Sequence, residues 1–210
     1  MKKLISRTIG DVPRNLPTQL TVLRIILTPI FLVLIFTSGL KFKILAFAVY
    51  ILAILTDRYD GILARKYGVI SKWGKFLDPL ADKILVSSAL FAFYFLGYIQ
   101  LWVVIVIVVR DFLITGLRSY ALFKEKPVAT MYMAKVKTFV QMISVFIIFL
   151  FLIIKQIGES METEFAFIQF LEGIHFIDYL MILVVLLTIY TGIMYFIENR
   201  SHIFSLIKTS

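Results

Sequence analysis

Residues 137 to 155 read KTFVQMISVFIIFLFLIIK, with no charged residue between the two terminal lysines. A helix of about 20 apolar residues is long enough to cross the roughly 30 Å hydrocarbon core of a bilayer. Five more apolar stretches of similar length occur at about residues 20–39, 43–60, 79–97, 100–121 and 177–197. The sequence therefore predicts an all-α integral membrane protein, in which residues 1–210 form a single bundle of six transmembrane helices.

The overall composition agrees with the membrane class. Sixty per cent of the 210 residues are hydrophobic and 17% are charged, whereas a typical soluble domain has about 25% charged residues. The net charge of +9 does not indicate nucleic acid, because the basic residues lie between the apolar stretches and on one side of them. The chain has no cysteine, which excludes disulfides, thiol catalysis and thiolate metal sites.

The distribution of Lys and Arg predicts the orientation, because positive residues concentrate in cytoplasmic loops. Here they precede the first stretch, separate the second from the third and the fourth from the fifth, and close the chain. The opposite loops, 97–100 and 158–178, are neutral or acidic, and Lys41 and Lys43 are the exception. We therefore expect both termini on the cytoplasmic side.

Residues 1–17 form an N-terminal juxtamembrane segment. Its apolar residues, Leu4, Ile5, Ile9 and Val12, are spaced among basic ones, which predicts a short interfacial helix on the anionic inner leaflet. A frayed basic tail is the alternative. Prolines and charges interrupt any apolar core here, so we expect no cleaved signal peptide.

Four of the thirteen acidic residues fall within a short segment: Asp57, Asp60, Asp78 and Asp82. Helical residues three or four apart share one face, so these aspartates form two carboxylate pairs. Four anions beside a membrane repel each other and resist desolvation unless cations neutralise them. Oxygen ligands without Cys or His favour Mg²⁺ or Mn²⁺ over Zn²⁺. The spacing predicts one or two divalent cations, and a pair of them would suit phosphoryl transfer.

Small residues accompany the carboxylates. Gly61 follows the second aspartate, Ala64 lies about one turn later, and Gly74 precedes the third aspartate by four residues. Their lack of bulk lets a ligand approach the backbone, and Arg65 is placed to bind a phosphate bidentately. The alternative is that the acids are ordinary loop residues and the glycines serve helix packing.

The complete pattern is Asp57-x-x-Asp60-Gly61-x-x-Ala64-Arg65, then eight residues, then Gly74-x-x-x-Asp78-x-x-x-Asp82. It resembles the signature of the CDP-alcohol phosphotransferase family at every fixed position and interval. The resemblance implies a six-helix membrane fold, usually a homodimer, with two divalent cations bound by the four aspartates. It also implies that Asp82 is the base that deprotonates the attacking alcohol.

The same resemblance implies a binding site for the CDP moiety of the donor. It places Gly61, Arg65 and Ser71 in contact with that moiety. We assign Ala64, Gly74, Thr18 and Thr21 to the same CDP-diacylglycerol site; an alternative for Thr18 is a helix cap.

Three further segments resemble bacterial phosphatidylglycerophosphate synthases. They are NLPTQLTVLR at 15–24, RDFLITGLR at 110–118 and AKVKTFVQ at 134–141. Asp111 stands where that group usually has Glu, and Ala134 where it has Gly. This resemblance implies phosphatidyl transfer from CDP-diacylglycerol to sn-glycerol 3-phosphate, at the cytoplasmic face of the bacterial plasma membrane.

Four basic residues are candidates for binding the acceptor phosphate: Arg110, Arg118, Lys135 and Lys137. The two arginines are eight residues apart, close to one face of a helix, and the lysines lie in the next cytoplasmic segment. Arg offers a fork of donors and Lys a point charge. The alternative for either lysine alone is topological anchoring. We take Asp111 as an ion partner rather than a metal ligand.

Other functions stay open from the residues alone. Within the family, inositol phosphate, serine or phosphatidylglycerol are alternative acceptors. A divalent-cation transporter is the alternative from another class, but such proteins commonly show paired repeats with interrupted helices near the midplane. Here the acids gather at one membrane face without a second copy. His175, in the acidic outer loop, we interpret as an ordinary surface residue.

Overall fold

The computed structural model of the protein describes the backbone of residues 16–67, 72–124, 132–163 and 165–208, and the side chains of residues 23–56, 80–122, 124, 132–163 and 165–200. This part of the chain is helical and contains no strand. Its helices are α1 (Leu16–Phe36), α2 (Leu40–Tyr67), α3 (Lys72–Phe95), α4 (Leu101–Phe123), α5 (Tyr132–Ser160), α6 (Ala166–Gly173) and α7 (Phe176–Lys208). The expected interfacial helix falls mainly on residues 1–15, outside the described residues.

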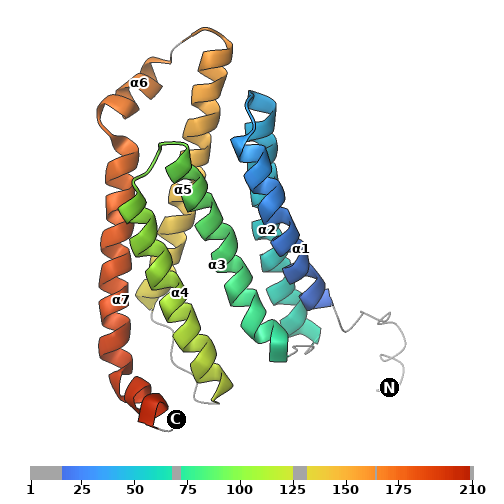
Figure 1. Cartoon of the computed structure of the whole chain (residues 1–210), viewed down its shortest axis with the longest axis vertical. Helices are drawn as coiled ribbons and strands as arrows, with labels where there is room; N and C mark the ends of the chain where they lie inside the picture. The colour runs from blue at the N-terminus through green and yellow to red at the C-terminus, as the bar shows by residue number, and fades with distance from the viewer. Residues whose placement is uncertain (1–15, 68–71, 125–131, 164, 209–210) are drawn as a thin grey trace, which may run out of the picture.

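Each of the six predicted spans coincides with one long helix, which confirms the all-α class for the described residues. The short α6, which leads into α7, was not predicted. The long helices α1 to α5 alternate in direction, and α7 returns from the end where α6 lies, so that α1 begins and α7 ends at the same end of the bundle (Figure 1). Among the described residues, Tyr132–Ser160 and Phe176–Arg200 are long and apolar enough to cross a membrane. The count of six crossings stays a prediction.

Tight turns join the helices at the end where α6 lies. Gly97 ends α3 with a φ of 80°, and the amides of Gly97 and Tyr98 donate to the carbonyls of Tyr94 and Phe93. This is the Schellman arrangement, in which glycine adopts the left-handed conformation without steric cost. Lys43, an exception in the charge distribution, donates its Nζ to the carbonyl of Ile35 in the last turn of α1. Its charge thus satisfies a helix C-terminus.

The core is aromatic where four helices meet. Phe149 of α5 lies 5.9 Å from Phe31 of α1, 5.2 Å from Tyr50 of α2 and 5.0 Å from Phe93 of α3, measured between ring centroids. All four rings are buried. Tilted and edge-on pairs of this kind add to the stability gained by burial, and they fix α5 against the first three helices.

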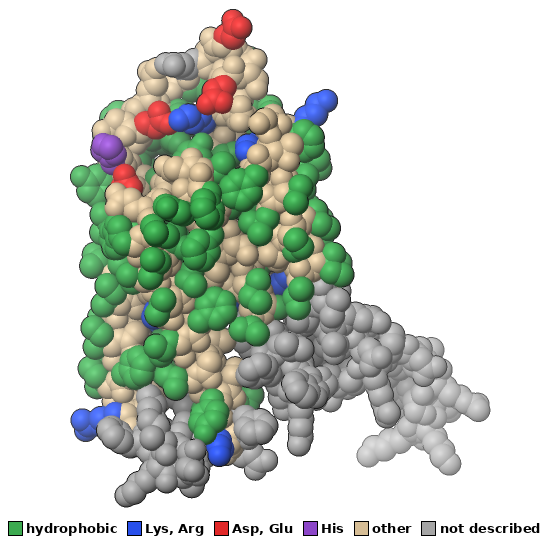
Figure 2. All heavy atoms as spheres, viewed as in Figure 1, with side chains coloured by type: hydrophobic (Ala, Val, Ile, Leu, Met, Phe, Trp, Pro, Cys, Tyr) green, Lys and Arg blue, Asp and Glu red, His purple; other side chains and the backbone are tan. Residues whose placement is uncertain are grey.

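The outer surface of the bundle is apolar as well. Large hydrophobic side chains such as Val33, Phe95 and Leu186 are more than half exposed, and Figure 2 shows hydrophobic side chains covering the middle of the visible face. Among the described side chains on that face, the acidic ones gather at the end where α6 lies. An apolar belt of this extent suits contact with lipid, because soluble monomers rarely expose such large contiguous patches.

Candidate functional site

The structure places the aspartate signature on two consecutive, packed helices. Asp57 and Asp60 lie in the last turns of α2, and Asp78 and Asp82 lie in the first turns of α3. The two helices contact each other, and only residues 68–71 separate them. Because both segments are helical, the spacing of three and of four residues puts each pair on one face of its own helix, as predicted.

The backbone of the residues predicted to bind CDP-diacylglycerol lies around the same end of the bundle. Gly61, Ala64 and Arg65 belong to α2, Gly74 belongs to α3, and Thr18 and Thr21 belong to the beginning of α1. Their side chains, like those of Asp57, Asp60 and Asp78, fall outside the described residues, and so does Ser71 altogether. Their roles remain predictions.

Asp82 is the one aspartate of the signature whose side chain is described. Its Oδ2 lies 3.1 Å from Nζ of Lys83, and its side chain is 37% exposed. An accessible carboxylate at the start of a span is suited to take a proton or to bind a cation. Within the described side chains no group of three metal ligands occurs. The predicted donor set nonetheless fits Mg²⁺ or Mn²⁺, because it would consist of carboxylates from two adjacent helices.

A second polar group lies inside the bundle and joins three helices. Nζ of Lys137 on α5 lies 2.6 Å from Oδ1 of Asp111 on α4, and Nη1 of Arg110 lies 3.1 Å from the same oxygen. Lys137 is fully buried, and the Asp111 side chain is 6% exposed. The sequence interpretation of Asp111 as an ion partner is thus confirmed. We call Arg110, Asp111 and Lys137 the basic cluster.

Neutral side chains hold the two cations of the basic cluster. Lys137 donates a second hydrogen bond, of 2.6 Å, to Oε1 of Gln141 one turn later on α5. Arg110 donates from Nη2 to the hydroxyl of Thr191 on α7, at 2.8 Å. A methyl group at Gly192 would lie 3.5 Å from Cγ of Arg110, so the arginine runs directly along α7. Each cation is therefore tied to a carboxylate and to a neutral acceptor.

The charges of the basic cluster do not cancel. Arg110 and Lys137 contribute +2 and Asp111 contributes −1, which leaves +1, and Lys83 is near enough to act electrostatically on both Asp111 and Lys137. Buried excess charge is costly in a membrane bundle, and ionisable residues there usually mark ligand or ion pathways. A phosphate anion is the kind of ligand that would balance this charge.

The other two residues predicted for the acceptor phosphate are placed differently. Arg118 on α4 and Lys135 on α5 are exposed, and within the described part of the chain no ion pair joins them to the basic cluster. Lys135 thus fits the alternative of surface anchoring as well as it fits a phosphate ligand. Lys137 does not fit the alternative of surface anchoring, because a fully buried ammonium group cannot reach the lipid headgroups.

Sequence reasoning assigned no role to several side chains around this region: Lys83, Gln141, Thr191 and Tyr195. A signal for the last three was present as polar stripes at helical spacing. On α5, Lys137, Gln141 and Ser144 continue the buried stripe of Ile148 and Leu152. On α7, Thr188, Thr191, Tyr195 and Asn199 are buried at intervals of three or four residues. A polar stripe on the buried face of an apolar helix indicates a functional lining.

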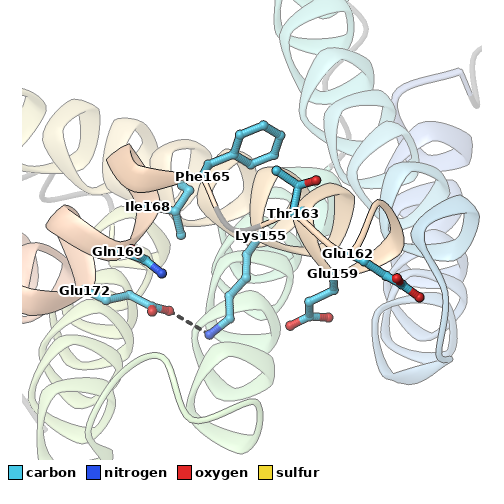
Figure 3. Close-up of a pocket in the computed structure, with 9 residues that line it drawn as sticks. Lys155, Glu159, Glu162, Thr163, Phe165, Ile168, Gln169 and Glu172 are labelled. Carbon is cyan, nitrogen blue, oxygen red and sulfur yellow. Dashed lines mark hydrogen bonds and ion pairs between the residues drawn. The ribbon is translucent and has the colours of Figure 1, made fainter.

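The opposite end of the bundle holds a cavity of about 500 Å³ between α5 and α6. Figure 3 shows Lys155 and Glu172 pointing toward one another across it, with Nζ and Oε1 2.6 Å apart. Glu159 and Glu162 also line this cavity. The nearby His175 is 75% exposed and lies 3.4 Å from Asp178, which confirms it as a surface residue. This cavity is far from the aspartate signature, at the other end of α3 and α5 (Figure 1).

Comparison with known proteins bears on both polar regions at the signature end. The CDP-alcohol phosphatidyltransferase family matches residues 14–190. That range contains the signature and the basic cluster, and ends just before Thr191.

Curated bacterial proteins are similar over much of this range. A probable phosphatidylglycerophosphate synthase of Mycobacterium tuberculosis is 38% identical over 134 residues, covering 62% of the chain and 64% of the relative. The CDP-diacylglycerol–glycerol-3-phosphate 3-phosphatidyltransferase of Bacillus subtilis is 39% identical over 143 residues, covering 62% and 74%. The protein of that name from Rickettsia felis is 30% identical over 168 residues, covering 77% and 93%. The aligned chain thus spans just under two thirds of the mycobacterial relative.

Proposed function

The chain belongs to the CDP-alcohol phosphatidyltransferase family, and on that premise we propose that it is a phosphatidylglycerophosphate synthase. It transfers the phosphatidyl group of CDP-diacylglycerol to sn-glycerol 3-phosphate and releases CMP, a step of phospholipid biosynthesis. The names of the relatives from Bacillus subtilis and Rickettsia felis support this reaction. The observation that carries the proposal is the complete aspartate signature on the adjoining ends of α2 and α3.

The donor lipid enters from the membrane. Its acyl chains lie in the bilayer against the apolar belt, and its CDP moiety lies at the signature end, beside Gly61, Ala64, Arg65, Ser71 and Gly74, with Thr18 and Thr21 of α1 nearby. Residues 1–210 form one membrane domain with both termini in the cytoplasm of a bacterium. This orientation agrees with the excess of Lys and Arg at the signature end. A homodimer is the expected assembly.

The acceptor enters from the cytoplasm. Its phosphate is bound by the basic cluster through Arg110 and Lys137, helped by Arg118 and Lys135, and its primary hydroxyl is thereby oriented toward Asp82. Holding two reactants in one geometry replaces a random encounter with an oriented one, which lowers the barrier substantially. The excess charge of the cluster supports a phosphorylated acceptor over serine.

Asp82 accepts the proton of the primary hydroxyl of the acceptor. The hydroxyl oxygen forms a bond to the β-phosphorus of the donor, and the bond from that phosphorus to the bridging oxygen breaks. That oxygen leaves with its electron pair as part of CMP, and phosphatidylglycerophosphate stays in the membrane. Two divalent cations, Mg²⁺ or Mn²⁺, held by Asp57, Asp60, Asp78 and Asp82, would neutralise charge on the diphosphate and on the leaving phosphate.

The test is the release of CMP by detergent-purified protein supplied with CDP-diacylglycerol, Mg²⁺ or Mn²⁺, and one acceptor at a time. We expect release with glycerol 3-phosphate and only in the presence of metal. Release with inositol phosphate, serine or phosphatidylglycerol instead would keep the family and reject this acceptor. No release with any acceptor would contradict the proposed reaction and favour cation transport.

Two variants sharpen this assay. Asp78→Ala removes a predicted metal ligand, and we expect turnover to fall to background while the helical content and the unfolding temperature in detergent stay close to those of the wild type. Asp178→Asn, at the opposite end of the bundle beside His175, is the matched control and should keep full activity. Wild-type rates in Asp78→Ala would refute the site.

A further inference from the structure

Two buried hydrogen-bond donors, one within the basic cluster and one on α7, have no partner among the residues that the structure describes. They are Nε of Arg110 on α4 and the hydroxyl of Tyr195 on α7. Tyr195 is 3% exposed. A buried donor without a partner costs about 1–3 kcal/mol, and buried polar groups in native proteins are nearly always satisfied. Two such donors in one region indicate that a ligand completes their hydrogen bonds.

The two donors lie at similar levels of the bundle, because both are linked to the same part of α7. Arg110 donates from Nη2 to Thr191, and Tyr195 lies one turn after Thr191 on α7. Long side chains on a helix lean toward its N-terminus, and for Tyr195 that is the direction of Thr191 and Arg110. Tyr195 therefore follows the acceptor of Arg110 by one turn on the same helix, toward the signature end of the bundle.

The charges around Tyr195 are positive. Arg118 and Arg110 both act electrostatically on its phenol, and Arg118 lies eight residues, about two turns, beyond Arg110 on α4. On α7, Tyr195 lies four residues, about one turn, beyond Thr191, which accepts the hydrogen bond from Arg110. A neutral donor that feels two guanidinium groups is suited to bind an anion with several acceptor oxygens, such as a phosphate.

We propose that Tyr195 is a phosphate-binding residue of the acceptor site, and that its hydroxyl, together with Nε of Arg110, donates to the acceptor phosphate. This inference rests on the proposed function and deepens it, because it adds α7 to a site that the sequence motifs confine to α4 and α5. Arg118 joins the same site from the exposed side. The contact selects acceptors that carry a phosphate over those that do not.

Tyr195→Phe tests the inference, because it removes the hydroxyl and keeps the ring. We expect the KM for glycerol 3-phosphate to rise about tenfold, as for the loss of one hydrogen bond to a charged group. The KM for CDP-diacylglycerol and the kcat should change by less than about twofold, since binding of the phosphate is the same before and during transfer. Tyr190→Phe, at a half-exposed position of the same helix, is the matched control and should match the wild type in all three constants.

A binding measurement separates this inference from the proposed reaction. Inorganic phosphate should raise the unfolding temperature of the wild type and of Tyr190→Phe, and should raise that of Tyr195→Phe clearly less, because a ligand stabilises in proportion to its affinity. This holds even if glycerol 3-phosphate is not the acceptor. An unchanged KM together with unchanged protection by phosphate would overturn the inference. The inference would also be overturned if Tyr195→Phe lowered the unfolding temperature of the unliganded protein but changed neither the KM nor the protection by phosphate. Tyr195 would then contribute only to packing.

Discussion

The two lysines at the ends of the apolar stretch of α5 form ion pairs of equal length in unequal surroundings. Lys137 and Asp111 are 2.6 Å apart, and so are Lys155 and Glu172. The side chains of the first pair are 0% and 6% exposed, whereas those of the second are 37% and 45% exposed. Distance therefore does not distinguish the two contacts, and the energetic difference has to come from burial.

Burial changes what happens when one partner is lost. In the exposed pair, water solvates whichever charge remains, so such pairs contribute about 0–1 kcal/mol. In the buried pair no water replaces the partner, and removing one member costs about 3–5 kcal/mol. The buried lysine also carries hydrogen bonds that are fixed by packing. The comparison teaches that the same kind of ion pair contributes very differently at the two ends of α5, because only one of the pairs is buried.

The largest effect should come from breaking the buried pair. Asp111→Ala leaves Lys137 beside Arg110 without a counter-ion, and we expect the free energy of unfolding to fall by about 3–5 kcal/mol. Activity with glycerol 3-phosphate should be lost, because both cations lose their orientation. Thermal unfolding in detergent and CMP release are the measurements.

Two companion variants interpret that result. Asp111→Glu restores the residue usual in the related synthases and should retain most stability and activity. The double variant Asp111→Leu with Lys137→Met removes both charges, so it should recover stability yet stay inactive. An active double variant would show that the buried pair does not serve the acceptor.

A smaller loss is expected at Gln141, which accepts the second hydrogen bond of Lys137. Gln141→Leu should lower the free energy of unfolding by about 1.5–3 kcal/mol, the range for hydrogen bonds to charged groups. The control is Ser144→Ala on the same buried face, whose hydroxyl bonds only the carbonyl of Val140 in its own helix. Equal unfolding temperatures for the two variants would contradict the role of Gln141.

Thr191 should have an effect of about 1 kcal/mol, because Thr191→Val keeps the shape and removes the acceptor of Arg110. Most of this should appear as a roughly fivefold higher KM for glycerol 3-phosphate. Thr191→Ser should restore the wild-type value. Thr188→Val is the matched control, since Thr188 is buried one turn earlier and its hydroxyl donates to the carbonyl of Val184 in its own helix. A similar KM change there would argue for a packing effect.

The exposed pair should give the smallest effect. Glu172→Gln is expected to change the free energy of unfolding by less than about 1 kcal/mol and to leave the kinetic constants unchanged. The small difference should shrink further in about 1 M salt, where the Debye length is about 3 Å. A large loss of activity in this variant would contradict the assignment of function to the opposite end.

The sequence predicted the elements and missed some of their contacts. The apolar stretches located the six long helices, because each stretch is about 20 residues long and almost uniformly apolar. The exposed His175 and the ion-paired Asp111 were also interpreted correctly. The short α6 was missed because eight residues carry too little periodicity to stand out. The pairing of Asp111 with Lys137, 26 residues apart, depends on how α4 and α5 pack.

The sequence by itself determined the membrane class, the aspartate signature and, through its resemblance, the family, because composition and the spacing of residues along the chain do not depend on how the helices pack. Only the tertiary structure decided which of the four candidate phosphate ligands come together. Arg110 and Lys137 meet at one carboxylate inside the bundle, while Arg118 and Lys135 stay exposed. It also brought Thr191 of α7 to that cluster, because burial and contact between distant helices are set by their packing and are not encoded in the spacing within any one of them.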